Sequence, residues 1–487
     1  MWKQSQHRSC QRFLLPSLGI VLLFTVHILW LNPIAQAPLP VSQDNLWQNL
    51  HALLEKHEPQ CPSPNLLGRT AGIPRFDAND ESPRIDLIVN SDELQQPLRA
   101  AHDGFVRDMQ PLKAIRAYHP RTKGIVSAAG GKYLPTFLVS LHLLRRTGSK
   151  LPVELFLKDW TEYEPYICEI VLPPLNAKCV VLSVVLSSLD SGDSSYPIEG
   201  YQIKSFAILF SSFERVIWID ADILLLDDPA RLLDCEPFSS SGLLTWPDFW
   251  KNTASPLYFN ISRQPEPPNN ARQATEAGVV LVSKKTHYMT LILAAYYNYH
   301  GPSYYYPLLD QGAPGEGDKD TFLHAATALG AKYHTVSETV ADLGHPDRWN
   351  RGIIGAAMLQ ADPREDYALT QRGKWRVRDP SVAKPARGFF IHSYNPKFNA
   401  AALLASEKSR TKDGDPSRLW TSSKETLERL GYDAERTLWQ EVKKVTCSLE
   451  HAFDAWKSKS GLCEGVQNHW DAVFEDASAE VPKFTMT

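Results

Sequence analysis

A strand that ends in two aspartates is the feature that most constrains this chain. Residues 216–219 (Val-Ile-Trp-Ile) are apolar and rich in β-branched and aromatic types, which is typical of a buried strand. Asp220 and Asp222 follow directly, separated by one residue. In an α/β sheet, ligands bind at the carboxyl ends of strands, and carboxylate oxygens suit a hard cation such as Mg²⁺ or Mn²⁺ together with a phosphate. The pattern therefore predicts a metal–diphosphate site; the alternative is a solvated acidic turn.

Strands and helices alternate around this feature, which predicts an α/β fold with a mostly parallel sheet. Residues 124–129 and 153–157 are expected to be strands, with a helix at 135–146 between them. Residues 201–210 are expected to form a helix that leads into the central strand, with Lys204 near its start. Lys204 could contact a nucleotide or diphosphate at the mouth of the sheet; an ordinary solvated lysine is the alternative.

The two ends of the chain differ in composition from this core. Residues 13–31 contain no charged side chain and are preceded only by basic charges, which predicts an uncleaved membrane anchor with a cytosolic N-terminus. A cleaved signal peptide is the alternative, because residues 35–37 form a small-x-small site. Proline-rich patches in 32–118 suggest a stem, and helical patterns in 403–487 suggest an accessory extension.

Charge and cysteines narrow the class of protein. A formal net charge of −4 gives no electrostatic footprint for nucleic acid. Six of the seven cysteines lie beyond the apolar run, and an oxidising lumen would permit disulfides. Cys447 with Cys463 and Cys168 with Cys179 are the expected pairs, although six cysteines allow fifteen connectivities.

Three stretches together resemble a known family. They are 213–222, which contains the Asp-x-Asp motif, 276–281 (Glu-Ala-Gly-Val-Val-Leu) and 311–322, which contains Gly-Glu-Gly-Asp-Lys. They resemble glycosyltransferase family 71, the fungal Golgi α-mannosyltransferases with a GT-A fold. Ala277 stands where many members have Ser, and both residues are small. The resemblance implies GDP-mannose as donor, Mn²⁺ or Mg²⁺ as cofactor, retention of anomeric configuration, and α-1,2 or α-1,3 linkages to mannose-terminated glycans.

Further side chains outside the central motif are candidates for the site. Glu276 could accept hydrogen bonds from sugar hydroxyls, and Lys397 could pair with the diphosphate. Asp318 could cap the helix expected at 319–329 or reach into the site, and Lys319 beside it could be a counter-charge. His392 ends an apolar strand; a lone histidine is usually structural, but the resemblance implies a metal ligand. The expected roles are catalytic for Asp318 and Glu316, donor-binding for Asp220, Lys204, Lys397 and Glu276, and metal-binding for Asp222, Asp220 and His392.

These expectations describe a type II Golgi membrane enzyme that can associate with other Golgi transferases. One alternative is a catalytically degenerate member that binds nucleotide-sugar or glycan for a partner enzyme. A metal-dependent phosphohydrolase is less compatible, because apolar residues 223–226 follow the motif where a small or hydroxyl residue is needed. The expected organisation is a cytosolic tail (1–12), an anchor (13–31), a stem (32–118), a GT-A catalytic domain (119–402) and a helical extension (403–487).

Overall fold

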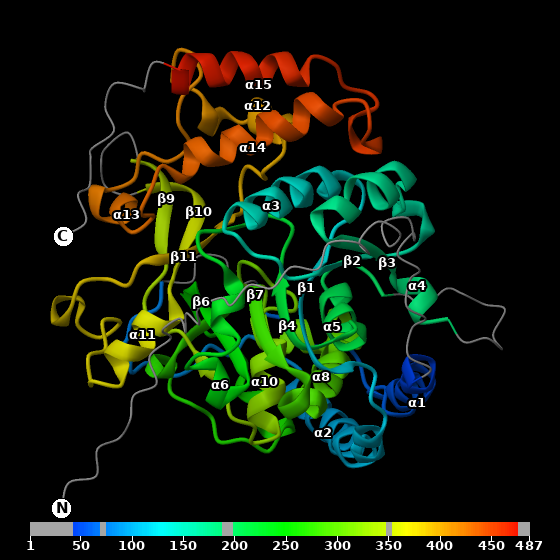
Figure 1. The fold of residues 1–487 in the computed structure, drawn as a ribbon. Coiled ribbons are helices and arrows are strands. Elements are labelled where there is room, and N and C mark those ends of the chain that lie inside the picture. Colours follow the sequence, from blue (N-terminus) through cyan, green and yellow to red (C-terminus); the bar gives the residue numbers. More distant parts are fainter. Residues whose placement is uncertain (1–41, 69–74, 188–197, 347–352, 476–487) are drawn as a thin grey trace, which may run out of the picture.

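A seven-stranded sheet lies at the centre of the described chain (Figure 1). The computed structural model describes residues 42–68, 75–187, 198–346 and 353–475. The strand order is β3-β2-β1-β4-β7-β6-β8, in which β3, β2, β1 and β4 are parallel and β7 is antiparallel to both β4 and β6. This confirms the α/β fold with a mostly parallel sheet. The strands are β1 (His119–Ala128), β2 (Val153–Leu157), β3 (Ala177–Val181), β4 (Phe213–Ile219), β6 (Leu243–Lys251), β7 (Gln273–Ser283) and β8 (His334–Thr335).

A second, antiparallel sheet lies beside the carboxyl end of β4. Its order is β5-β11-β10-β9, formed by β5 (Ile223–Leu225), β9 (Ala341–Pro346), β10 (Ile353–Ala361) and β11 (Gly388–Ser393). Because β5 begins one residue after Asp222, the pairing of β5 with β11 brings a distant part of the chain to the Asp-x-Asp motif.

Both faces of the central sheet are covered, because successive side chains of a strand point to opposite faces. Ile217 of β4 belongs to one apolar cluster and Val216 to the other. Helix α3 (Leu134–Arg146) packs on the first face, and α5 (Gln202–Phe210) and α8 (Lys284–Tyr299) contribute to the second. The remaining helices of this body are α4 (Leu182–Val185), α6 (Phe238–Ser241), α7 (Pro256–Ile261), α9 (Tyr306–Asp310), α10 (Thr321–Ala328) and α11 (Pro363–Thr370).

The described part of 32–118 is packed against the catalytic body. Helices α1 (Ser42–Lys56) and α2 (Ser91–Asp108) contribute to the second apolar cluster. Trp47 of α1 is buried and meets Phe206 and Phe210 of α5 edge to face, at centroid distances of 6.0 and 6.2 Å. These residues are therefore part of the globular domain, not a stem that holds it away from a membrane.

The expected membrane anchor at 13–31 lies outside the described residues. Within the described ranges, the helices are too short or too polar to cross a bilayer.

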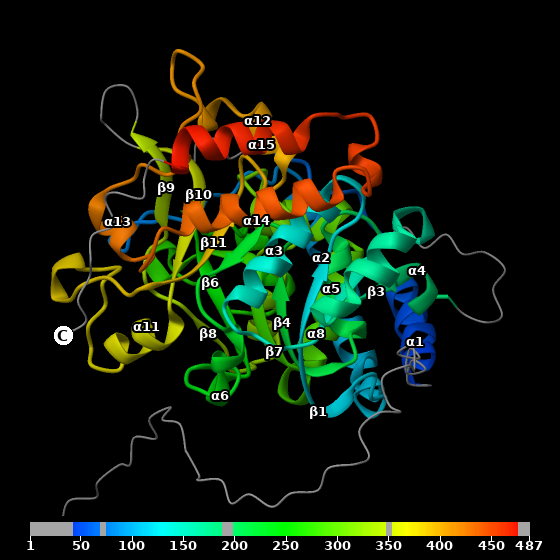
Figure 2. The ribbon, with the colours of Figure 1, turned by 45° about the horizontal axis from the view of Figure 1, so that its top comes forward.

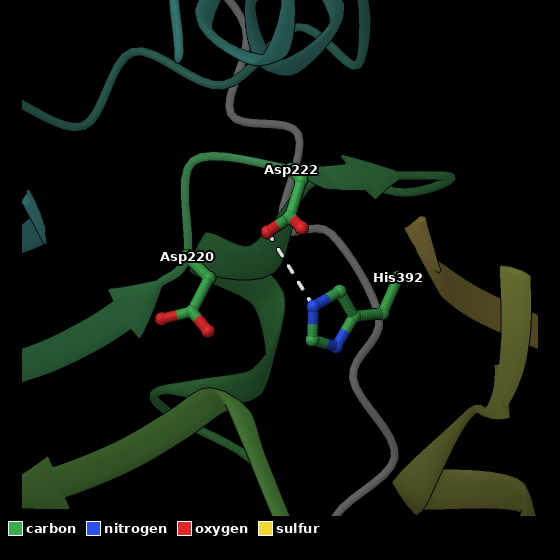
Figure 3. A group of neighbouring side chains, drawn as sticks. All are labelled: Asp220, Asp222 and His392. Carbon is green, nitrogen blue, oxygen red and sulfur yellow. Dashed lines mark ion pairs between the residues drawn. The ribbon is translucent and has the colours of Figure 1, made fainter. Parts of the chain in front are cut away.

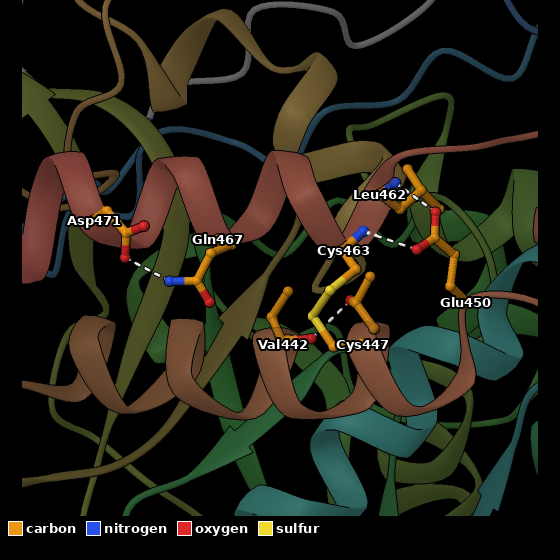
Figure 4. Close-up of a disulfide and its surroundings, with 8 residues drawn as sticks. Val442, Cys447, Glu450, Leu462, Cys463, Gln467 and Asp471 are labelled. Carbon is orange, nitrogen blue, oxygen red and sulfur yellow. Dashed lines mark hydrogen bonds between the residues drawn. A yellow bond between two sulfur atoms is a disulfide. The ribbon is translucent and has the colours of Figure 1, made fainter.

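Helices α12 (Ala400–Ala405), α13 (Lys424–Glu428), α14 (Ala434–Leu449) and α15 (Leu462–Trp470) form the C-terminal part, as expected. Figures 1 and 2 show α14 and α15 lying over α3 at one side of the sheet. A disulfide between Cys447 and Cys463 joins α14 to α15 (Figure 4), and Glu450 accepts hydrogen bonds from the backbone N–H groups of Leu462 and Cys463. Cys168 and Cys179 form a second disulfide. Both expected pairs are confirmed.

Loss of the Cys447–Cys463 bridge is expected to destabilise the C-terminal helices. The bridge spans 16 residues, and a loop of this size restricts the unfolded chain enough to contribute about 3 kcal/mol. Replacing both cysteines by serine should lower the free energy of unfolding by that amount in denaturant titrations under oxidising conditions, which keep the Cys168–Cys179 bridge intact in both proteins. A double variant as stable as the oxidised wild type would contradict this.

Glu435 of α14 should make stability depend on pH. Its carboxylate accepts hydrogen bonds from the N–H groups of Leu419 and Trp420, yet burial raises its pKa from 4.5 to about 7. The folded protein then binds this proton more tightly than the unfolded chain does, so the free energy of unfolding should fall as pH rises between these values, by about 3 kcal/mol. Glu435→Gln should remove this part of the pH dependence in unfolding titrations from pH 4 to 8. An unchanged slope would show that Glu435 is already ionised.

Candidate active site

The Asp-x-Asp motif lies where β4 ends and β5 begins. Ile219 pairs with Val279 of β7, and the N–H of Asp220 donates to the carbonyl of Gly278 at 2.8 Å. The indole N–H of Trp218 donates to Asp220 Oδ1 at 2.7 Å, which fixes this carboxylate. Both acids are therefore held at the carboxyl edge of the parallel strands, as the sequence predicts.

His392 is brought to the motif by the second sheet. It pairs with Ile223 of β5, and its Nε2 lies 3.4 Å from Asp222 Oδ1 (Figure 3). One ligand atom each from Asp220, Asp222 and His392 lies within 4.8 Å of the others, close enough to share one cation. The structure thus places together the three side chains that the sequence analysis assigned to a metal.

Glu276 contacts His392 from the opposite side of the imidazole. It lies within β7, and it is buried. Its Oε1 accepts the N–H of Gly278 at 2.5 Å and lies 2.8 Å from His392 Nδ1. Oε2 is buried and has no hydrogen-bond partner among the described residues. Glu276 thus holds the ring so that Nε2 faces Asp222; its contact with the donor stays a prediction.

Opposite charges dominate the surroundings of Asp222. Burial would disfavour its charge, but His392 and Lys397 outweigh it and lower the pKa of Asp222. The same balance raises the pKa values of both His392 and Lys397, because Asp222 lies beside them. Lys397 Nζ donates to Asp222 Oδ2, and its side chain remains 32% exposed, so this cation can be reached from solvent.

Lys204 joins Asp220 to the glycine-rich loop. Its ammonium lies 2.7 Å from the carbonyl of Ala277, 3.0 Å from Asp318 Oδ2 and 3.2 Å from Asp220 Oδ1. Burial opposes its charge, but Asp220 and Asp318 outweigh that and raise its pKa. An ammonium has three N–H groups, and these three oxygens account for them. The geometry therefore gives Lys204 a cross-linking role, and its expected contact with a nucleotide or diphosphate stays a prediction.

Asp318 does not cap the following helix, and that expectation is wrong. Helix α10 begins at Thr321 with Asp320 in the N-cap position, and no side chain there caps it. Asp318 instead faces Lys204, because the buried ammonium is a stronger partner for a carboxylate than a backbone N–H. Burial raises the pKa of Asp318. Its expected catalytic role stays a prediction.

Lys319, the last residue of the loop 311–319, is also buried. Its Nζ lies 3.1 Å from Asp248 Oδ2 and 3.9 Å from Asp310 Oδ1, and it donates to the carbonyl of Pro314 at 3.0 Å. A contact with diphosphate is not supported by this position. Asp248 and Asp310 were missed in the sequence, although an acid inside the aromatic run 246–250 is a usable signal of a buried ion pair. Glu316 is half-buried and lies outside the cluster of Asp220, Asp222 and His392.

Gly278 leaves room for the Glu276–His392 contact. A Cβ at this position would lie 2.5 Å from Glu276 Oε1 and 2.8 Å from His392 Nδ1, so both side chains would have to move. Disturbing the partner of a metal-binding histidine typically costs 10–100-fold in metal affinity. Gly278→Ala is therefore expected to weaken Mn²⁺ binding by about that factor, measured by calorimetry, with the fold intact by circular dichroism. Unchanged affinity would argue against His392 as a ligand.

A mostly parallel sheet that ends in Asp-x-Asp, with a histidine supplied by a second, antiparallel sheet, is the arrangement that the resemblance to GT-A glycosyltransferases implies. Residues 122–273 and 268–362 match a protein-family model described as "Mannosyltransferase putative". The chain belongs to this family of mannosyltransferases, as its resemblance to glycosyltransferase family 71 predicted.

Several relatives share most of this chain. The alpha-1,2-mannosyltransferase MNN21 of Candida albicans is 33% identical over 79% of this chain and 66% of its own length. MNN24 of the same organism is 30% identical over 88% of this chain and 74% of its own. MNN2 of Saccharomyces cerevisiae is 29% identical over 75% and 71%. Among solved structures, the glycosyltransferase GlyE of Streptococcus pneumoniae TIGR4 matches 75% of this chain and 66% of its own at 14% identity and a TM-score of 0.32, a likeness too distant to inform the substrate.

Proposed function

We propose that this protein transfers mannose from GDP-mannose to a hydroxyl group of a mannose-terminated glycan, forming an α-1,2 linkage. The observation that carries the proposal is the cluster of Asp220, Asp222 and His392 at the carboxyl end of β4, in a chain that belongs to a mannosyltransferase family. The sequence alone left α-1,2 and α-1,3 linkages open, and the relatives named above favour the first.

The side chains present fit a divalent cation. Two carboxylates and an imidazole that gives up its second proton on binding are suitable ligands for Mn²⁺, and carboxylates also suit Mg²⁺. Glu276 holds Nδ1 of His392, which leaves Nε2 directed at Asp222, as expected for a metal ligand with an orienting partner. When bound at Asp220, Asp222 and His392, such a cation would neutralise charge on the departing diphosphate.

Other side chains of the protein would bind the substrates and hold the carboxylates in position. Lys397 is the partly exposed cation beside Asp222 and would attract the diphosphate. Lys204 holds Asp220 and Asp318 in a fixed relation. Asp318 lies close to this cluster, where its carboxylate could accept a hydrogen bond from a sugar hydroxyl. Retention of configuration is also proposed, from the family resemblance.

The cellular setting is proposed from the sequence. An apolar run at 13–31 behind basic residues supports a type II Golgi membrane protein with a luminal catalytic domain, and complexes with other Golgi transferases would fit this setting. Protease protection of sealed Golgi vesicles tests the topology: the catalytic domain should be digested only after detergent is added.

A donor-by-acceptor screen tests the activity. Purified protein should transfer mannose from GDP-mannose, but not glucose from UDP-glucose, to an α-mannoside, and methylation analysis should show a 2-linked acceptor residue. Donor binding without turnover would favour the catalytically degenerate partner. Release of inorganic phosphate from phosphate esters would favour the phosphohydrolase.

A further inference from the structure

An exposed aromatic ring stands over the glycine-rich loop. Tyr201 is 62% exposed and precedes α5 directly. A Cβ on Gly317 would lie 2.8 Å from Cδ2 and 3.0 Å from Cγ of this ring, so the loop backbone touches Tyr201 only because residue 317 is glycine. One part of the ring is thus supported by the loop, and the rest is open to solvent.

The same helix fixes the ring relative to the site. Tyr201 and Lys204 are three positions apart at the start of α5, a spacing that places both on one side of the helix. Lys204 bonds to Asp318 and Asp220, and Asp318 is the neighbour of Gly317. The ring therefore lies beside Asp318, on the Asp220 side of the cluster, whereas His392 and Lys397 contact Asp222.

The charges near Tyr201 suit a neutral, hydroxyl-rich ligand. Asp318 and the half-buried Glu316 flank Gly317, and the N–H groups of Lys204 are all directed at protein oxygens. A phosphate would be repelled by the two acids, but a sugar could donate its hydroxyl hydrogens to them. The apolar face of a pyranose can in turn lie against an aromatic ring, which offers a large apolar surface and, in tyrosine, a polar tip.

We infer that Tyr201 is the stacking platform for the terminal mannose of the acceptor, with Glu316 as a hydrogen-bond acceptor for its hydroxyls. This inference rests on the proposed mannosyltransferase activity. The acceptor, and not the donor, is assigned to this ring because the donor's diphosphate belongs with Lys397 on the Asp222 side. The donor sugar then lies over the buried carboxylates, and the exposed ring at the rim meets the incoming glycan.

The test compares steady-state kinetics of wild type, Tyr201→Ala, Tyr201→Phe and Tyr201→Trp on GDP-mannose and an α-mannoside. Tyr201→Ala should raise KM for the acceptor about two- to tenfold. This factor corresponds to the free energy that an aromatic contact contributes in addition to burial of its surface. Tyr201→Phe and Tyr201→Trp should stay near wild type. KM for GDP-mannose and its slow hydrolysis without acceptor should not change. Tyr166→Ala is the matched control, because this tyrosine is 53% exposed on a separate segment, Tyr166–Val171.

The outcomes separate this inference from the proposed function. An unchanged acceptor KM in Tyr201→Ala, or a rise in the donor KM alone, would overturn the role of Tyr201 while mannosyl transfer stands. A wild type that transfers no mannose to any mannoside would instead overturn the proposed function. The thermal unfolding temperature of each variant is measured as well. A value equal to that of the wild type shows that a change in KM does not come from loss of the fold.

Discussion

Asp222→Asn is expected to lower kcat for mannosyl transfer by about a thousandfold, which corresponds to ~4 kcal/mol of barrier. Asp222 is buried and faces both His392 and Lys397. An amide of the same size removes the anion that both cations meet, so the variant should bind Mn²⁺ poorly and offset less of the charge that develops on the diphosphate. Initial rates at saturating GDP-mannose, with and without added Mn²⁺, measure the effect.

Asp228→Asn is the matched control for this substitution. Asp228 caps the short helix Pro229–Leu232 by accepting the N–H of Ala230. Asparagine caps helices about as well as aspartate, so this variant should keep its rate and its stability. Near-wild-type, Mn²⁺-dependent transfer by Asp222→Asn would mean that another group holds the cation.

Lys319→Met should cause the largest loss of stability, about 3–5 kcal/mol in the free energy of unfolding. The ammonium lies between Asp248 and Asp310, and all three side chains are buried. Methionine fills a similar volume but leaves the two acids without this cation. Burial already raises the pKa values of both acids, so they can take up protons as the pH falls. The deficit should therefore be larger at pH 8 than at pH 5 in urea titrations.

Lys285→Met provides the comparison, because Lys285 follows the buried Lys284 in α8 but is itself exposed. Surface substitutions usually change stability by less than about 0.5 kcal/mol. If Lys319→Met changed the free energy of unfolding as little as this, the ion pairs of Lys319 with Asp248 and Asp310 would not stabilise the fold.

Local patterns were enough to predict the centre of the fold and half of the site. The apolar run before Asp220 is a strand because four consecutive apolar residues, rich in β-branched and aromatic types, favour a strand buried on both faces. His392 could be chosen as a candidate from the sequence because an apolar strand leads into it. Its position next to Asp222 could not be predicted, since it depends on the pairing of β5 with β11, which are far apart in the sequence.

Other parts of the structure depend on contacts that no local pattern contains. Lys204 and Lys319 look like surface lysines in sequence, yet each is surrounded by acids from other elements. The docking of α1 had a signal that the proline-rich flanks obscured: Leu46, Leu50 and Leu54 recur every fourth residue and are fully buried. That spacing distinguishes a packed helix from a stem.

Calorimetric titration of the purified protein with Mn²⁺ tests the proposed metal site. Wild type and Asp228→Asn are expected to bind a single cation, and Asp222→Asn and His392→Ala are expected to lose that binding, with all four proteins folded. Equal Mn²⁺ affinity in wild type and Asp222→Asn would contradict the assignment of Asp220, Asp222 and His392 as the metal site.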